Sequence, residues 1–172
     1  MTLSSRGMSG PFKAVHTLGP RRYNGYTLAQ MTRMVVFVCE HGAAKSVIAA
    51  AWFRRMAADA RLDLRATARG TAPSGELAAV AVAGLLRDGI RPEEVVPERL
   101  GFQDLAEAWR VVGFAPEVTA DAAPDAEFEL WTVPPVSDGY DAARDVIVRK
   151  LTTLLDDAQT TIGHAAAVSD AD

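Results

Sequence analysis

The sequence contains one cysteine, three histidines and three lysines among 172 residues, and each scarcity excludes a class of protein. One cysteine can form no internal disulfide, no cysteine-based zinc cluster and no redox pair within the chain. His16, His41 and His164 stand far apart, so a histidine-rich metal site is not expected. No apolar run approaches the ~20 residues that a membrane span needs. We therefore expect a cytoplasmic protein with no membrane partner, no metal and no other cofactor.

Charge is distributed unevenly along the chain. The first thirty residues carry four basic side chains and no acidic one, so the net charge of −4 leaves −8 on the remaining residues. A folded body this acidic is a poor nucleic-acid binder, because phosphate contacts need clustered lysine and arginine. We therefore expect no nucleic-acid partner. The basic side chains are themselves biased, with fifteen arginines against three lysines, so the position of each lysine is informative.

The two ends of the chain differ in composition from its middle. Residues 1–32 contain Gly, Ser, Pro and Arg without a period, which favours a disordered extension or an upstream start before Met31 or Met34 over a transit peptide. Residues 33–160 predict a single α/β domain, which is long enough to bury a hydrophobic core. The Ala-rich residues 161–172 predict a flexible tail.

Strand-like and helix-like patterns alternate along the middle of the chain. We expect strands near 35–39, 62–68, 109–114 and 127–133, and helices near 46–60, 74–86, 103–107 and 141–158. Ser74 is a candidate N-cap for the second helix, Asp88-Gly89 is its stop signal, and the Pro-containing stretch 116–124 is an expected loop. This alternation predicts a parallel sheet with right-handed crossovers.

The single thiol lies where a parallel sheet binds its ligands. Cys39 ends the first expected strand, and ligands bind at the carboxyl ends of such strands beside helix N-termini. Five residues, mostly small, separate it from Lys45-Ser46 at the start of the next helix: Glu40, His41, Gly42, Ala43 and Ala44. A loop of this kind can turn successive N–H groups inward as an anion nest. The same field would stabilise a nucleophilic Cys39 thiolate.

Two other interpretations of this segment compete with a reactive thiol. An isolated cysteine at the end of a core strand is usually a small buried hydrophobe, but its position five residues before a base, a serine and a helix favours a reactive thiol. A Walker phosphate loop also places Lys-Ser at the start of a helix. It needs glycine directly before the lysine and again five residues earlier, where this chain has Ala44 and Cys39.

The segment from Cys39 to Ser46 resembles the C-x5-R-S loop of the low-molecular-weight protein tyrosine phosphatases and of the arsenate reductases that share their fold. Lys45 replaces the arginine. The likeness continues at 68–71, at 85–90 and at Trp131 with the following Pro134-Pro135, and it covers residues 34–158. The resemblance implies a single-domain α/β fold with a four-stranded parallel sheet in the order 2-1-3-4 and helices on both faces.

The resemblance also implies a cysteine-dependent enzyme that acts on a phosphate or arsenate oxyanion, including phosphotyrosine-type substrates, through a covalent thiol intermediate. Cys39 would attack phosphorus or arsenic, and Ser46 would support its thiolate. The loop residues listed above and Lys45 would bind the oxyanion, with Lys45 supplying charge. Because the chain has no second thiol, arsenate reduction would need an external thiol or a glutaredoxin-like reductant.

Several residues depart from the family pattern. Lys45 offers a compact charge in place of a planar fork, and Gly42 stands where the family usually has asparagine. Pro134 occupies the position of the family's general-acid aspartate. Asp138 is a candidate substitute, although a role at the start of the last helix is favoured for it. Glu40 would oppose phosphate binding if it faced the nest. These departures support an alternative, a catalytically weak pseudophosphatase that binds phosphate or phosphopeptides.

Overall fold

The computed structural model describes residues 22–23, 26–27, 33–114 and 126–169. The chain divides into two compact units, Met1–Met31 and Thr32–Asp172. In the first unit, the two-residue strands β1 (Arg22–Tyr23) and β2 (Tyr26–Thr27) pair in antiparallel register. The expected disorder of residues 1–32 stays a prediction. The expected loop at 116–124 lies outside the described residues.

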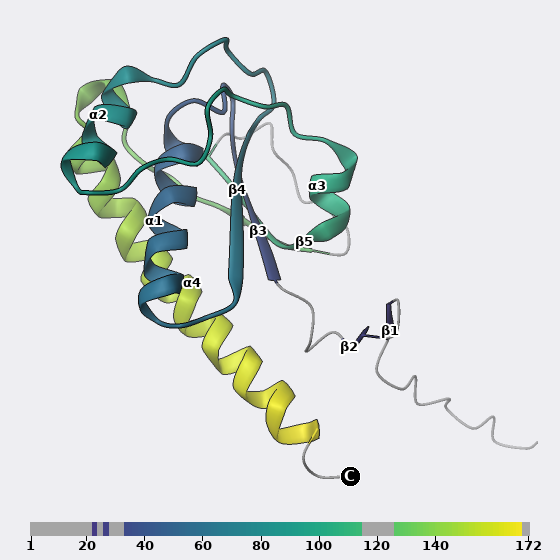
Figure 1. Ribbon diagram of the computed structural model, residues 1–172. Helices are drawn as coiled ribbons and strands as arrows, with labels where there is room; N and C mark the ends of the chain where they lie inside the picture. The colour runs from purple at the N-terminus through teal and green to yellow at the C-terminus, as the bar shows by residue number, and fades with distance from the viewer. Residues whose placement is uncertain (1–21, 24–25, 28–32, 115–125, 170–172) are drawn as a thin grey trace, which may run out of the picture. The chain divides into compact units, whose positions relative to one another are not determined.

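The second unit is built on a four-stranded parallel sheet (Figure 1). Its strands are β3 (Arg33–Cys39), β4 (Leu64–Gly70), β5 (Ala108–Gly113) and β6 (Glu127–Leu130). They lie in the order β4-β3-β5-β6, which confirms the predicted order 2-1-3-4. β3 is central because its apolar run is buried on both faces. The fourth strand ends earlier than the predicted 127–133, ahead of two prolines that cannot donate ladder hydrogen bonds.

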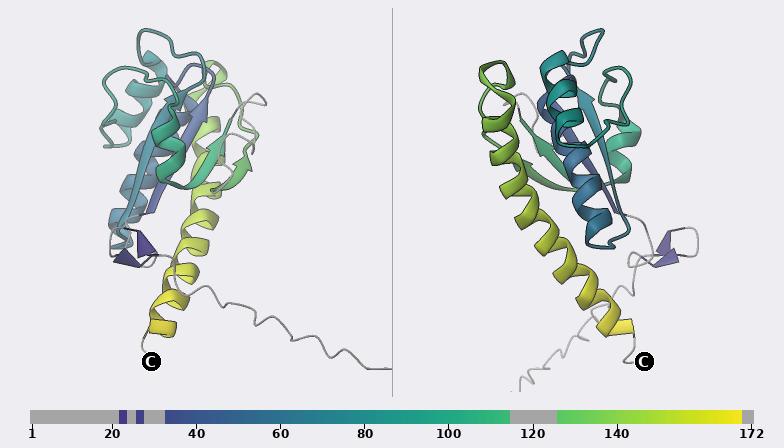
Figure 2. Two further views of the ribbon diagram at one scale, coloured as in Figure 1. Left: turned by 90° about the vertical axis from the view of Figure 1, so that its right-hand side faces the viewer. Right: turned by 60° about the vertical axis from the view of Figure 1, so that its left-hand side comes forward.

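Helices cover both faces of this sheet, as predicted (Figure 2). They are α1 (Lys45–Asp59), α2 (Ala79–Arg87), α3 (Phe102–Glu107), the 3-10 turn η3 (Val136–Asp138) and α4 (Tyr140–Ser169). Val35, Phe37 and Val112 point to the face that α1, α2 and α4 cover. The alternate side chains of the same strands, Val36 and Val111, pack instead with residues of α3 and the segment before it.

Two helix boundaries differ from the sequence expectation. Ser74 does not cap a helix: α2 begins at Ala79, and the Ser74 hydroxyl donates to the carbonyl of Glu76 at 3.4 Å. The expected stop after α2 is confirmed, because Gly89 has a φ of +74°. α4 continues to Ser169, beyond the expected end at 158 and through most of the predicted tail, in a stretch where alanine, the best helix former, is frequent.

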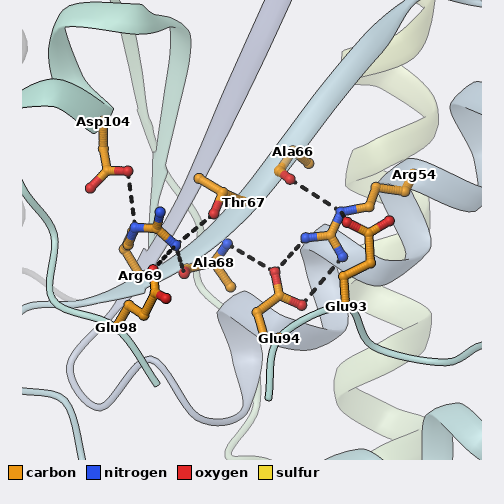
Figure 3. A network of polar contacts seen from close by, with 9 residues as sticks. All are labelled: Arg54, Ala66, Thr67, Ala68, Arg69, Glu93, Glu94, Glu98 and Asp104. Atoms are coloured by element: carbon orange, nitrogen blue, oxygen red, sulfur yellow. Dashed lines mark hydrogen bonds and ion pairs between the residues drawn. The ribbon is translucent and has the colours of Figure 1, made fainter. Parts of the chain in front are cut away.

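The outer edge of β4 is closed by side chains and by a neighbouring segment (Figure 3). Arg54 of α1 pairs with Glu94, and the Glu94 carboxylate in turn accepts the N–H of Ala68 at 3.3 Å. Farther along the strand, Gly70 donates to and accepts from the backbone of segment 98–100 at 2.8 and 2.9 Å. An edge strand with occupied donors and acceptors does not offer itself for pairing with another chain.

The loop after β3 packs directly against the end of β4. Gly42 has a φ of +64°, and a Cβ on it would lie 2.8 Å from the backbone nitrogen of Gly70. A Cβ on Gly70 would lie 2.8 Å from the nitrogen of Gly42 and from the carbonyl carbon of His41. Two backbones therefore meet where neither has room for a side chain, and this contact positions the loop that follows Cys39.

The start of α4 is fixed by a buried tyrosine. The Tyr140 hydroxyl donates to Asp88 Oδ2 at 2.8 Å and accepts from Trp52 Nε1 at 3.3 Å, while its ring fills the space above Gly84. Burial raises the pKa of Tyr140 to about 12. Burial works against the charge on Asp88, but hydrogen bonds from Arg144 and Tyr140 outweigh it and lower the pKa of that carboxyl. This cluster joins α4 to α1 and to the end of α2.

Tyr140 makes stability sensitive to alkaline pH. Its pKa is raised from 10.0 to about 12, so the unfolded chain ionises first and the stabilising contribution is lost as the pH rises from 10 toward 12. We expect the free energy of unfolding to fall by up to about 2–3 kcal/mol from this group. Urea unfolding at pH 9 and pH 11.5 should show the fall in the wild type and a smaller one in Tyr140→Phe. Parallel losses in the two proteins would contradict the assignment.

The contact between Gly42 and Gly70 predicts that two alanine substitutions differ in their cost to stability. Gly42→Ala combines a left-handed φ with a backbone clash, whereas Gly89→Ala has a φ of +74° with nothing within 4 Å of the new Cβ. The strain alone costs about 1–3 kcal/mol. We expect Gly42→Ala to lower the free energy of unfolding by clearly more than the matched control Gly89→Ala, as measured by urea unfolding. Equal losses would mean that the approach to Gly70 carries no constraint.

Candidate functional site

Cys39 ends the central strand, and its sulfur contacts a buried hydroxyl. The side chain is buried, and Sγ lies 3.1 Å from Oγ of Ser46, the second residue of α1. Ser46 is fully buried, and a buried hydroxyl needs a hydrogen-bond partner. The sulfur is that partner. When the sulfur is a thiolate, the only possible direction is donation from the serine hydroxyl to the sulfur.

The loop between Cys39 and α1 is held by its carbonyl groups. A segment that we call the strap, residues 71–78, donates backbone N–H groups to four of them. The pairs are Thr71 to Cys39 at 3.1 Å, Ala72 to Glu40 at 2.7 Å, Ser74 to His41 at 3.3 Å and Ala78 to Ala43 at 2.9 Å. The carbonyl of Ala44 accepts from Ile48 within the first turn of α1. The sequence motif alone gives no indication of this strap.

The N–H groups of the same loop have no acceptor among the described residues. Within the described part of the chain, no backbone or side-chain oxygen accepts a hydrogen bond from the N–H groups of residues 40–44. The loop is followed directly by α1, a helix of fifteen residues whose N-terminus adds a partial positive charge. Unpaired donors at a helix N-terminus are suited to binding an anion.

The loop lines a pocket of about 630 Å³. The pocket brings together six of the residues that the sequence singled out: Cys39, Glu40, His41, Ala43, Ala44 and Lys45. Gly42 lies in the same loop against Gly70, and Ser46 contacts the sulfur from α1. The half-buried Lys45 has no carboxylate within ion-pair distance among the described residues, so its charge is available to an anion in the pocket.

Asp138 is not brought to this pocket. It ends η3 with an exposed side chain that accepts a hydrogen bond from the Ser137 hydroxyl at 3.1 Å, and it does not line the pocket. The acidic residues that do line it are Glu40 and Glu76.

Glu76 and Phe114 are pocket residues that the sequence reasoning missed. Glu76 belongs to the strap, which follows β4, and Phe114 follows β5 directly. Both strands neighbour β3 in the sheet, so their carboxyl ends open at the same edge as Cys39. That sheet order, once predicted, was the signal that could have indicated both residues.

A second hollow, of about 740 Å³, lies beside the outer edge of β4. Two of its arginines are paired with carboxylates: Arg54 pairs with Glu94, and Arg69 pairs with Asp104 at 2.9 Å and with the exposed Glu98 at 3.1 Å (Figure 3). Among the described residues, no cluster of His, Cys, Asp or Glu is arranged to hold a metal ion, and no helix combines the length and apolarity of a membrane span.

Comparison with known proteins places the fold. No family model matches the chain, and no curated protein matches it. Solved structures do match. YfkJ from Bacillus subtilis aligns at 19% identity and a TM-score of 0.69, over 76% of this chain and 97% of that one.

Two further structures carry a described activity. A low-molecular-weight phosphotyrosine phosphatase from Vibrio cholerae O395 aligns at 18% identity and a TM-score of 0.64, over 74% of this chain and 97% of that one. A thioredoxin-dependent arsenate reductase from Corynebacterium glutamicum aligns at 18% identity and 0.64, over 76% of this chain and 63% of that one. The chain therefore has the fold of the low-molecular-weight phosphatases and arsenate reductases, as the resemblance of its loop predicted.

Proposed function

We propose that this protein is a cysteine-dependent enzyme that acts on a phosphate or arsenate oxyanion through a covalent thiol intermediate. The observation that carries the proposal is the position of Cys39 Sγ, 3.1 Å from the Ser46 hydroxyl and at the base of a loop with free N–H groups. A loop that only bound anions would have no physical need for a thiol there. Structures of similar fold include a phosphotyrosine phosphatase and an arsenate reductase, which supports both substrates.

For a phosphate ester, the chain's own residues would act in a fixed order. The N–H groups of the loop and the ammonium of Lys45 bind the non-bridging oxygens and stabilise the charge that develops on them. The Cys39 thiolate, with Ser46 donating to it, attacks phosphorus. An S–P bond forms while the P–O bond to the organic group breaks, and the leaving oxygen takes up a proton from water, because Asp138 does not line the pocket. Water then hydrolyses the cysteinyl phosphate, releases inorganic phosphate and regenerates the thiolate.

For arsenate, the same thiolate would displace hydroxide and form an S–As bond. A thiol from outside the chain would then attack the Cys39 sulfur, and the electron pair of the S–As bond would pass to arsenic, reducing As(V) to As(III). The mixed disulfide would be resolved by a further external thiol, because Cys39 is the only cysteine. A small thiol or a glutaredoxin-like protein is the class of reductant that this requires.

The alternative is a pseudophosphatase that binds phosphate or phosphopeptides with little turnover. Two observations favour it. Lys45 replaces the planar guanidinium that grips a phosphoryl group through two parallel hydrogen bonds. Asp138, the proposed proton donor to the leaving group, ends η3 and does not line the pocket. Absence of a general acid typically slows such a reaction by about 10²–10⁴-fold.

The thiol itself provides the first test. We expect Cys39→Ser to lower the hydrolysis of p-nitrophenyl phosphate and the thiol-dependent reduction of arsenate by on the order of 10³-fold or more, because the nucleophile is removed. Phosphate binding, measured by isothermal titration calorimetry, should persist, since the loop is retained. If both proteins bind phosphate while the wild type shows neither activity above the level of the variant, the protein is the pseudophosphatase.

Lys45 provides the second test, with a matched control in the same chain. Replacing a compact charge by a bidentate one should raise kcat/KM for aryl phosphates in Lys45→Arg by about tenfold or more. Lys150→Arg makes the same chemical change over the ring of Trp131, whose centroid lies 5.5 Å from Lys150 Nζ, and should leave kcat/KM unaltered. A rate in Lys45→Arg equal to that of the control would remove Lys45 from the oxyanion site.

A further inference from the structure

The pocket around Cys39 has charges of opposite sign at its base and at its rim. The base of the pocket is formed by the loop N–H groups, the N-terminus of α1 and Lys45, whose ammonium has no ion-pair partner among the described residues. Glu40 and Glu76 line the same pocket and are exposed, and we define these two residues as its rim. The base favours a bound oxyanion, whereas the rim repels one. A ligand that carries positive charge beside its oxyanion satisfies both parts of the pocket.

The rim carboxylates are only weakly compensated. Glu40 Oε1 lies 3.8 Å from His41 Nε2, and the two side chains are 58% and 59% exposed, so this contact is screened by water. Glu76 has no side-chain partner among the described residues. Arg99 reaches the strap, but its guanidinium donates to the carbonyl of Thr71 at 2.6 Å and does not line the pocket.

The backbone at both carboxylates is fixed, although their side chains are exposed. The carbonyl of Glu40 accepts from Ala72 at 2.7 Å, and that of Glu76 accepts from the Ser74 hydroxyl at 3.4 Å. The strap is bound to the loop on both sides of Glu76, through the N–H groups of Ser74 and Ala78. A charge held at one place on a pocket rim discriminates between ligands better than a charge on a free loop.

We infer that the site takes phosphorylated groups with positive charge beside the phosphate, of which the type is a phosphopeptide with lysine or arginine next to the phosphorylated residue. This inference rests on the proposed function and names its substrate class. The phosphate lies on the cationic base, and the adjacent basic side chains meet Glu40 and Glu76. Free arsenate, free phosphate and acidic phosphopeptides carry nothing for the rim to bind and are repelled by it.

The size of this preference follows from Coulomb's law. One contact between unit charges at 4 Å in water changes a binding constant by about fivefold. Two carboxylates that attract basic flanks and repel acidic ones would separate the two peptide types by roughly several hundred-fold without screening. Because both residues are exposed to water and salt, we expect about 10- to 100-fold in kcat/KM. The ratio of kcat/KM between the two peptide types should fall when the ionic strength of the assay is raised from about 0.05 to about 0.5 M, because the Debye length then shortens roughly threefold.

Three phosphotyrosine peptides that differ only in their flanking residues, arginine, glutamine or glutamate, test the inference. We expect kcat/KM to fall in that order for the wild type. Glu40→Gln/Glu76→Gln should lose most of this order and gain activity toward the glutamate peptide. Glu107→Gln/Glu129→Gln removes the same charge outside the pocket and should keep the order. An order that is absent from the wild type, or equally weakened in both double variants, overturns the inference.

A binding measurement separates this inference from the proposed function. Cys39→Ser should bind the same peptides, labelled for fluorescence anisotropy, in the same order of affinity without turnover. A preference for the arginine peptide in this variant, with no Cys39-dependent hydrolysis by the wild type, would support the inferred role of the rim and contradict the proposed enzymatic function. Hydrolysis of p-nitrophenyl phosphate and of all three peptides at equal kcat/KM would support the proposed enzymatic function and overturn the inferred preference for basic flanks. Failure of the variant to bind any of the peptides also overturns the inference.

Discussion

The backbone contact between Gly42 and Gly70 is the constraint on which the pocket depends. It brings the loop after β3 and the end of β4 to a distance at which a side chain on either residue would collide with the other backbone. Only at this separation can the strap that follows β4 donate its N–H groups to the loop carbonyls. The strap satisfies those carbonyls, and the loop N–H groups, which have no acceptor within the described part of the chain, are available to a ligand.

Arginine and lysine have different roles in the described part of the chain. Several guanidinium groups of the described fold are paired with carboxylates: those of Arg54, Arg69, Arg87, Arg110 and Arg144 are examples. The planar fork of arginine is suited to such paired contacts. Lys45 has no such partner within the part of the chain that the structure describes, although Glu40 and Glu76 line the same pocket. Among the described residues, the anion site thus has its formal positive charge from lysine, the residue type for which no ion pair is found there.

Local patterns in the sequence were enough to predict the strands, their parallel arrangement and the loop from Cys39 to Ser46, because these rest on residues that are neighbours in the chain or on the alternation of strands and helices. The strand order 2-1-3-4 came from the resemblance to the low-molecular-weight phosphatases. The predictions that failed, or were not made, concern residues whose position depends on contacts between segments far apart in the sequence. Ser74 has the side chain of an N-cap, but its N–H is taken up by the carbonyl of His41 and α2 begins later. Glu76 reaches the pocket through the same backbone pairing, which no spacing within the strap reveals.

The position of Glu76 also depends on interactions at the far end of α2. Ala78, the N-cap residue of this helix, donates its N–H to the loop carbonyl of Ala43. Asp88, the C-cap residue, accepts hydrogen bonds from Tyr140 and Arg144 of α4. The helix is therefore held at one end by the pocket and at the other by the buried start of α4. Because α2 has nine residues and no proline, it forms one regular helix between the Tyr140 cluster and the strap that carries Glu76.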